Sequence, residues 1–287
     1  MSARERLPPV RELKISIPGL ELGGLAWGEP DAQPLLMIHG WLDNAASFAL
    51  LAPKLADRFH VIALDLPGHG HSSHLPEATI YQHVGYVRAM LAAADSLALP
   101  RFHLLGHSLG AGVATMLAVA APERVRGLAL IEGLGPLGDD GSRTLDRFRE
   151  AMALKTTGNR PLRVFPTIES AAEARAMASG LAPELGRYIV ERGLSAVDGG
   201  YSWRSDPRLS RPTAVRLAET QVMALLLGLA APTSLLLANP HPPYLEPDSL
   251  QVRIDCVENI RVTHMDGGHH LQLEHPEAVA NWVHAAF

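Results

Sequence analysis

The sequence predicts an α/β fold: a mostly parallel, doubly wound sheet that carries a helical insertion. Two observations support this class. Short apolar runs alternate with helix-length segments, and this alternation is interrupted once, between residues 133 and about 229. The runs are continuously apolar rather than alternating, which is typical of parallel strands buried on both faces of a sheet. Regular alternation of strands and helices is typical of α/β proteins.

The chain is predicted to start with a hairpin, because two strand-like stretches, residues 13–17 and 20–27, flank the turn residues Pro18 and Gly19. The apolar runs that predict the central strands are residues 35–38, 61–64, 102–105, 128–131, 234–238 and 260–263. Helix-like spacing of apolar residues predicts helices over residues 45–55, 81–97 and 109–120.

The interruption predicts a second domain, because it is much longer than a connecting loop. We expect residues 1–134 and 230–287 to form the core domain and residues 135–229 to form a helical cap domain. Within the cap, Met177, Tyr201 and Trp203 are candidates for lining a substrate pocket, although packing inside the cap is the favoured role for each of them.

Composition narrows the function classes. The 287 residues are 47% hydrophobic and 19% charged, and 25 basic against 30 acidic residues give a net charge of −5 without a basic stripe, so nucleic acid is not an expected partner. The single cysteine excludes an internal disulfide framework. No apolar run is long enough to span a membrane, and the first residues do not resemble a secretory signal. We therefore expect a cytoplasmic protein that acts on a small molecule, with a homodimer as an open possibility.

The strongest chemical signal is the sequence Gly-His-Ser-Leu-Gly at residues 106–110, which matches G-x-S-x-G. An apolar strand is predicted before it and a helix of small residues after it. In such a sharp turn the hydroxyl of Ser108 stands clear of the sheet, and the amide of Leu109 and the helix N-terminus face developing negative charge. The pattern predicts that Ser108 is the nucleophile that attacks an ester-like or otherwise activated carbonyl.

Three further motifs accompany the serine on both sides of the insertion: His39-Gly40 after a strand, LDLPGHGHS at residues 64–72, and GGHHLQLEHP at residues 267–276. Together with the serine motif, they resemble the α/β-hydrolase superfamily, and specifically its serine hydrolases with a cap domain. The resemblance implies the α/β-hydrolase fold and a serine esterase-like activity that needs neither a cofactor nor a metal.

The resemblance also implies a catalytic histidine and an oxyanion hole. In the family, the histidine lies five residues before the glutamate of a closing E-x-P motif, here Glu274, which selects His269 over His270. The backbone amides of Trp41 and Leu109 would bind the oxyanion. His270 is expected to line or pack the pocket wall.

The acid of the triad departs from the commoner family pattern, which places an aspartate just beyond the strand that follows the cap. Residues 238–243 carry no carboxylate, and Glu246 and Asp248 lie further along the chain. Glu132 follows the strand after the nucleophile helix, a position from which some members of the superfamily take their acid. We therefore predict Glu132, with the later carboxylates as the alternative; a Glu132 that is merely solvated or paired with an arginine is the other competing interpretation. Asp65 is expected to organise a turn.

Several readings of the function compete. An ester-like bond of a small, mostly apolar substrate is the first, and a lactone or a carbon–carbon bond cleaved by the same triad is the second. A zinc-dependent hydrolase is an alternative from another class, because His69, His71 and His74 have the spacing H-x-H-x-x-H, although Ser73 replaces the aspartate that such enzymes carry. A non-catalytic member of the fold that binds a ligand is the last.

Overall fold

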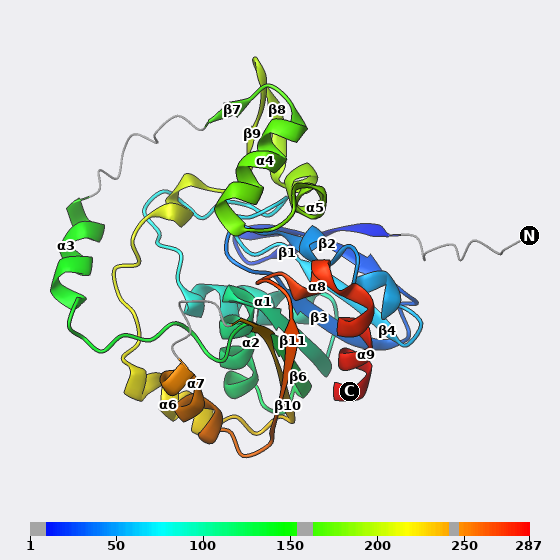
Figure 1. The fold of residues 1–287 in the computed structure, drawn as a ribbon, viewed down its shortest axis with the longest axis vertical. Coiled ribbons are helices and arrows are strands. Elements are labelled where there is room, and N and C mark those ends of the chain that lie inside the picture. Colours follow the sequence, from blue (N-terminus) through cyan, green and yellow to red (C-terminus); the bar gives the residue numbers. More distant parts are fainter. Residues whose placement is uncertain (1–9, 154–162, 241–246) are drawn as a thin grey trace, which may run out of the picture.

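The computed structural model describes residues 10–153, 163–240 and 247–287, and its centre is an eight-stranded sheet (Figure 1). In spatial order, the strands are β1 (Arg11–Ile17), β2 (Leu20–Trp27), β4 (Phe59–Leu64), β3 (Gln33–Ile38), β5 (Phe102–His107), β6 (Val125–Ile131), β10 (Thr233–Asn239) and β11 (Ile260–Asp266). The hairpin of β1 and β2 is antiparallel, β2 pairs antiparallel with β4, and the strands from β4 to β11 are parallel. The predicted fold class is confirmed.

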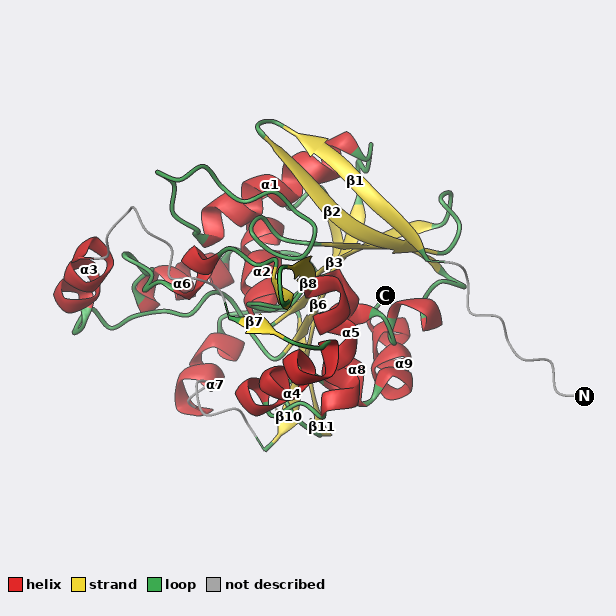
Figure 2. Ribbon diagram, turned by 90° about the horizontal axis from the view of Figure 1, so that it is seen from above, coloured by secondary structure: helices red, strands yellow, loops and turns green. Residues whose placement is uncertain are grey.

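Helices cover both faces of the sheet, as expected of a doubly wound fold (Figure 2). On one face, α1 (His83–Ser96) and α2 (Leu109–Ala120) bury apolar side chains against the strands. On the other face, α8 (Leu271–Glu274) and α9 (Pro276–Ala286) pack with the segment that follows β3. The parallel strands therefore end at one shared edge, where open α/β sheets bind their ligands.

The single helix predicted over residues 45–55 is wrong. Two short 3₁₀ helices stand there instead, η1 (Ala45–Phe48) and η2 (Ala52–Lys54). Pro53 lies inside the predicted helix, in its last turn, and a proline there lacks the N–H that the helix needs and collides with the preceding turn. Phe48 and Leu51 are still fully buried, so the apolar pattern was right about burial and wrong about the element.

Residues 135–229 contain helices and a small sheet. The helices are α3 (Thr144–Ala153), α4 (Ile168–Ser179), α5 (Pro183–Gly193), η3 (Pro207–Ser210) and α6 (Glu219–Leu227). The antiparallel sheet has the order β7 (Val164–Phe165), β9 (Gly200–Trp203), β8 (Leu194–Val197), and the sequence did not predict it. In Figure 1 this sheet, α4 and α5 lie over one end of the central sheet. In contrast, α6 packs against α2 through Val222 and Leu226.

One more helix packs against the central sheet. Helix α7 (Pro247–Asp255) follows β10 and buries Leu250 against the α1 and α2 face of the sheet. Among the described residues, no helix is both long enough and apolar enough to cross a membrane.

Candidate active site

Ser108 occupies the sharp turn between β5 and α2. Its backbone has φ +53° and ψ −114°, a strained region that residues other than glycine rarely adopt. Both glycines of the motif are required by packing: a Cβ on Gly106 would collide with the carbonyl of Gly110, and a Cβ on Gly110 would collide with the carbonyl of Ile38. The turn is held further by the amide of Ser108, which donates to the Ile131 carbonyl at 2.9 Å. This close packing supports the strained serine.

Glu132 stands at the carboxyl end of β6, fully buried and also with a positive φ of +57°. Its Oε1 accepts a hydrogen bond from the Ala238 amide at 2.6 Å, and its Oε2 lies 3.2 Å from Nδ1 of His269. Ala238 is the second-last residue of β10, just before the place where the commoner family pattern has the acid, and its backbone N–H holds the glutamate. Because the side chain of Glu132 is fully buried, it is not merely solvated. The two described polar contacts of its carboxylate are with the Ala238 amide and His269, and neither is with an arginine.

His269 lies in the loop between β11 and α8. The amide of Gly268 donates to Glu274 Oε2 at 2.5 Å, so the glutamate of the E-x-P motif closes this loop. Burial lowers the pKa of His269 below its ordinary value, against the opposing effect of the Glu132 carboxylate. A neutral ring that donates from Nδ1 to Glu132 keeps a lone pair on Nε2, which is the form that a general base needs.

The loop after β3 carries Trp41, whose backbone amide is the first predicted oxyanion donor. His39 is buried, donates from Nδ1 to the Gly40 carbonyl at 2.7 Å, and accepts the Leu66 amide on Nε2 at 2.9 Å. Leu42 has a φ of +58°, another strained position. The indole N–H of Trp41 donates to the Leu209 carbonyl at 3.1 Å, which links this loop to the inserted segment. Leu109, the second predicted donor, is the first residue of α2.

A cavity of about 590 Å³ contains Ser108, Leu109, Glu132 and Trp41 in its wall. Other lining residues come from residues 133–137 and from a segment of the insertion, Leu209, Ser210, Arg211, Pro212, Thr213, Val215, Arg216 and Leu217. Most of the wall is apolar. The cavity therefore places the predicted nucleophile, the predicted acid and the predicted oxyanion donors around one space.

Comparisons with known proteins agree with this geometry. A sequence model of the alpha/beta hydrolase fold matches residues 33–168. A serine hydrolase-like protein of Danio rerio is 30% identical over 284 residues, which cover 95% of this chain and 86% of the relative. The chain belongs to the α/β-hydrolase family. Its structure superposes on a hypothetical protein from Pseudomonas aeruginosa PAO1 with a TM-score of 0.88 and 38% identity, covering 96% of this chain and 98% of that one.

A thioesterase domain from the curacin biosynthetic pathway is also similar, with a TM-score of 0.83, 26% identity and coverage of 96% and 99% of the two chains. The chain is therefore a hydrolase, and its relatives are serine hydrolase-like proteins. The family resemblance carried by the four sequence motifs is confirmed.

For three residues of the insertion, pocket lining was the less favoured of two predicted roles, and the structure supports the favoured role, packing, for two of them. Met177, Tyr201 and Trp203 do not line the cavity that contains Ser108. The side chain of Met177 is 90% exposed, and the two aromatic residues pack with Phe165 inside the insertion. The lining segment at residues 209–217 is mostly irregular, so it has no helical or strand periodicity by which the sequence could have revealed it.

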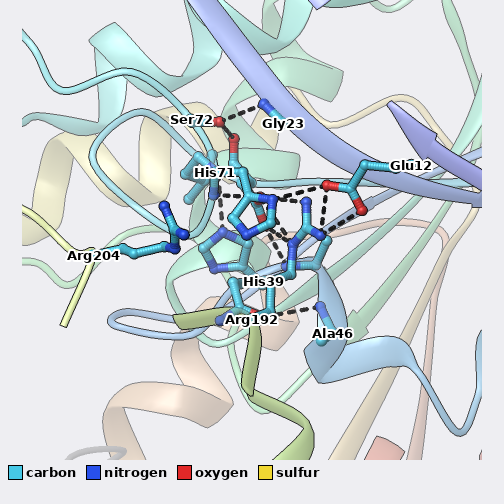
Figure 3. A network of polar contacts seen from close by, with 12 residues as sticks. Glu12, Gly23, His39, Ala46, His71, Ser72, Arg192 and Arg204 are labelled. Atoms are coloured by element: carbon cyan, nitrogen blue, oxygen red, sulfur yellow. Dashed lines mark hydrogen bonds and ion pairs between the residues drawn. The ribbon is translucent and has the colours of Figure 1, made fainter. Parts of the chain in front are cut away.

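Asp65 has the structural role predicted for it. Its carboxylate is fully buried and accepts the amides of Ala45 at 2.7 Å and His71 at 2.9 Å. Arg192 of α5 completes the site with Nε and Nη2 at 3.0 and 2.7 Å from Oδ2, and its Nη1 reaches Glu12 at 2.8 Å (Figure 3). The sequence did not indicate this ion pair, which joins the inserted helix α5 to the turn after β4.

The structure contradicts the zinc alternative, because the three histidines face different partners. His69 is buried and contacts the Pro67 carbonyl, and burial lowers its pKa to about 3. His71 contacts Glu12 at 2.9 Å, and His74 contacts the Arg204 carbonyl at 2.8 Å. In the described parts of the chain, the trio of possible ligands that does converge is Asp43, His107 and His270.

Of the two later carboxylates, the structure describes only Asp248. Asp248 is exposed in the first turn of α7. Glu246 lies outside the described residues.

Proposed function

We propose that this hydrolase cleaves an ester-like bond of a small, mostly apolar substrate through a triad of Ser108, His269 and Glu132 and a covalent acyl-enzyme. The observation that carries the proposal is the 3.2 Å contact between Nδ1 of His269 and Oε2 of Glu132, next to a serine in a strained strand-to-helix turn. The ring of His269 also lies 4.7 Å, centroid to centroid, from the ring of His107, the residue before the serine.

The first half of the reaction forms the acyl-enzyme. Nε2 of His269 takes the proton of the Ser108 hydroxyl as its oxygen attacks the carbonyl carbon, and the carbonyl electron pair moves onto oxygen. The amides of Trp41 and Leu109 donate to that oxyanion, and each such donor typically stabilises the transition state by about 3–4 kcal/mol. Glu132 accepts the hydrogen bond from the Nδ1–H group throughout, without taking its proton, and stabilises the imidazolium. When the carbonyl re-forms, the alcohol or thiol leaves with the proton from Nε2.

The second half releases the acid. Nε2 of His269 takes a proton from water, whose oxygen attacks the acyl carbon of the ester on Ser108. Collapse of the second tetrahedral intermediate breaks the bond to the serine oxygen, which recovers its proton from the imidazolium. Atoms and charges balance with water as the only co-reactant, so the proposal needs neither a metal nor a cofactor.

The cavity supports the substrate class. Its volume of about 590 Å³ suits a small molecule, and its wall is mostly apolar. Residues 210–217 and 135–137 belong to the segment expected to form a cap, so we infer that residues 135–229 act as a cap domain that sets specificity. A thioesterase among the similar structures supports an acyl transfer to water.

Active-site labelling and ester turnover test the proposal together. A fluorophosphonate probe should label wild-type protein at Ser108, and wild-type protein should release p-nitrophenol from short-chain esters. Ser108→Ala should fold normally and lose labelling, with turnover reduced on the order of 10⁴-fold or more. Retention of a tenth of wild-type turnover by Ser108→Ala would contradict the assignment. Binding of such esters without any turnover would favour a non-catalytic member of the fold. Turnover of only lactones or carbon–carbon substrates would support the triad but show that the bond cleaved is not an ordinary ester.

A further inference from the structure

Asp43 is a buried carboxylate that the proposed chemistry does not use. It lies in the loop after β3, is 2% exposed, and follows Trp41 by two residues. Its Oδ2 accepts a hydrogen bond from Nε2 of His270 at 3.2 Å and another from the Ser47 hydroxyl at 3.2 Å. Nδ1 of His107 lies 3.6 Å from the same oxygen. Two histidines therefore face one oxygen of Asp43.

These two histidines are chain neighbours of the proposed catalytic residues. His107 precedes Ser108, and His270 follows His269. Nε2 of His107 donates to the carbonyl oxygen of His269 at 2.8 Å, so His107 also holds the backbone of the catalytic loop directly. The loop of Trp41, the turn of Ser108 and the loop of His269 thus meet at a single carboxylate, although they are far apart in the sequence.

A fourth element reaches the same carboxylate from the inserted segment. Arg175 of α4 forms an ion pair with Oδ1 of Asp43 and is itself largely buried. Burial alone would raise the pKa of Asp43, but His270, His107 and Arg175 outweigh it and hold this pKa well below its ordinary value. The carboxylate therefore stays charged, and a buried charge that is paired on both oxygens resists movement.

We propose that Asp43 is a positioning residue that acts through His107 and His270 to hold the loop of His269 and the loop of Trp41 around Ser108. The inference rests on the proposed function, because it assigns Asp43 a role toward those three residues. Asp43, His107 and His270 act as a polar cluster rather than a metal site: His270 donates a hydrogen bond to Asp43, His107 approaches it to 3.6 Å, and the guanidinium of Arg175 already neutralises the carboxylate.

The strained backbone nearby fits this role. Leu42, between Trp41 and Asp43, has a φ of +58°. Such a conformation persists only where the surrounding contacts outweigh its cost. The bonds of Asp43 to His270, Ser47 and Arg175 supply contacts of this kind immediately after the strained residue. Loss of the carboxylate should let the loop relax and move the Trp41 amide.

Asp43→Asn tests the inference. Misplacement of catalytic groups by about 1 Å typically costs on the order of 10²-fold in rate, so we expect kcat for a p-nitrophenyl ester to fall by about that factor, with a much smaller change in KM. Among the described residues, the titratable groups that act on His269 include Glu132 just after β6, His107 from β5, Asp43 from the loop after β3, and the adjoining His270. Because the charge of Asp43 raises the pKa of His269, its loss should move the acid limb of kcat/KM to lower pH.

Asp206→Asn is the matched control, because Asp206 is also a buried aspartate paired with an arginine, Arg208, but does not contact His107 or His270. It should keep the wild-type kcat and acid limb. A proton NMR experiment adds a readout that needs no turnover: the low-field signal of the His269 Nδ1 proton, bound to Glu132, should broaden or shift in Asp43→Asn and persist in Asp206→Asn.

Each outcome decides the matter. An Asp43→Asn protein with wild-type kcat, acid limb and low-field proton would overturn the positioning role, even if Ser108→Ala is inactive and the proposed function stands. An inactive wild-type enzyme would count against the proposed function, while the NMR comparison would still test Asp43. If Asp43→Asn does not fold, His270→Phe, which keeps a ring of similar size but cannot donate, should show the same loss of kcat and the same spectral change; wild-type behaviour would overturn the inference.

Discussion

Replacing Glu132 with glutamine would change one atom of a fully buried side chain and keep its shape. In the native protein, its two oxygens accept from two donors, the Ala238 amide at 2.6 Å and Nδ1 of His269 at 3.2 Å. Glutamine has one acceptor oxygen and one NH₂ group. If the oxygen stays on the Ala238 amide, the NH₂ group faces His269 and favours the tautomer with its proton on Nε2, which cannot take the serine proton.

The magnitude follows from these two bonds. Loss of a hydrogen bond to a charged group costs about 1.5–3 kcal/mol of stability, which a folded domain of this size should tolerate. The effect on the reaction is larger, because an acid replaced by its amide in a Ser-His-acid triad lowers turnover on the order of 10⁴-fold while leaving the geometry intact. We therefore expect Glu132→Gln to keep most of its stability and to lose nearly all activity.

The assay is steady-state turnover of a p-nitrophenyl ester, together with the unfolding midpoint of each protein. Asp248→Asn is the control within the described structure, because this carboxylate is exposed in the first turn of α7, and Glu246→Gln tests the other late carboxylate. Both should turn over the ester like the wild type. Near-wild-type turnover by Glu132→Gln, with loss of activity in Asp248→Asn or Glu246→Gln, would refute the reasoning and move the acid to the later loop.

Three other predictions follow from the structure. Because burial lowers the pKa of His269 and the base acts only when neutral, kcat/KM should stay high below the ordinary titration range of histidine; an acid limb above that range would contradict this assignment. Arg192→Met should lower the free energy of unfolding, measured in urea, by about 3 kcal/mol, since it leaves the buried carboxylate of Asp65 without its ion-pair partner. The control is Arg187→Met, on the exposed side of the same helix, which should leave the urea midpoint unchanged. Exchange of residues 135–229 for the equivalent segment of a relative should alter the range of esters cleaved, and an unchanged range would show that the core alone selects the substrate.

Local patterns in the sequence were enough to predict most of the core. A continuous apolar run, a glycine-rich turn and a helix of small residues are short-range features, so the turn of Ser108 could be located from the residues around it. Local patterns do not specify the order of the strands in the sheet. They do predict that the sheet is mostly parallel, because strands buried on both faces have unbroken apolar sequences. The same reasoning misread residues 45–55, because apolar spacing reports burial and Pro53 decides which element can form.

The sequence by itself also determined the candidates for catalysis: Ser108 from its turn, His269 from its distance to Glu274, and Glu132 as a charged residue at the end of an apolar strand. Their catalytic roles stay predictions. What only the tertiary structure decided is how they are held. The Ala238 amide that binds Glu132 is 106 residues away along the chain, and Asp43, His107 and His270 come from three separate segments of the chain. Contacts between distant segments depend on how strands and helices pack, and no local pattern of residues records that packing.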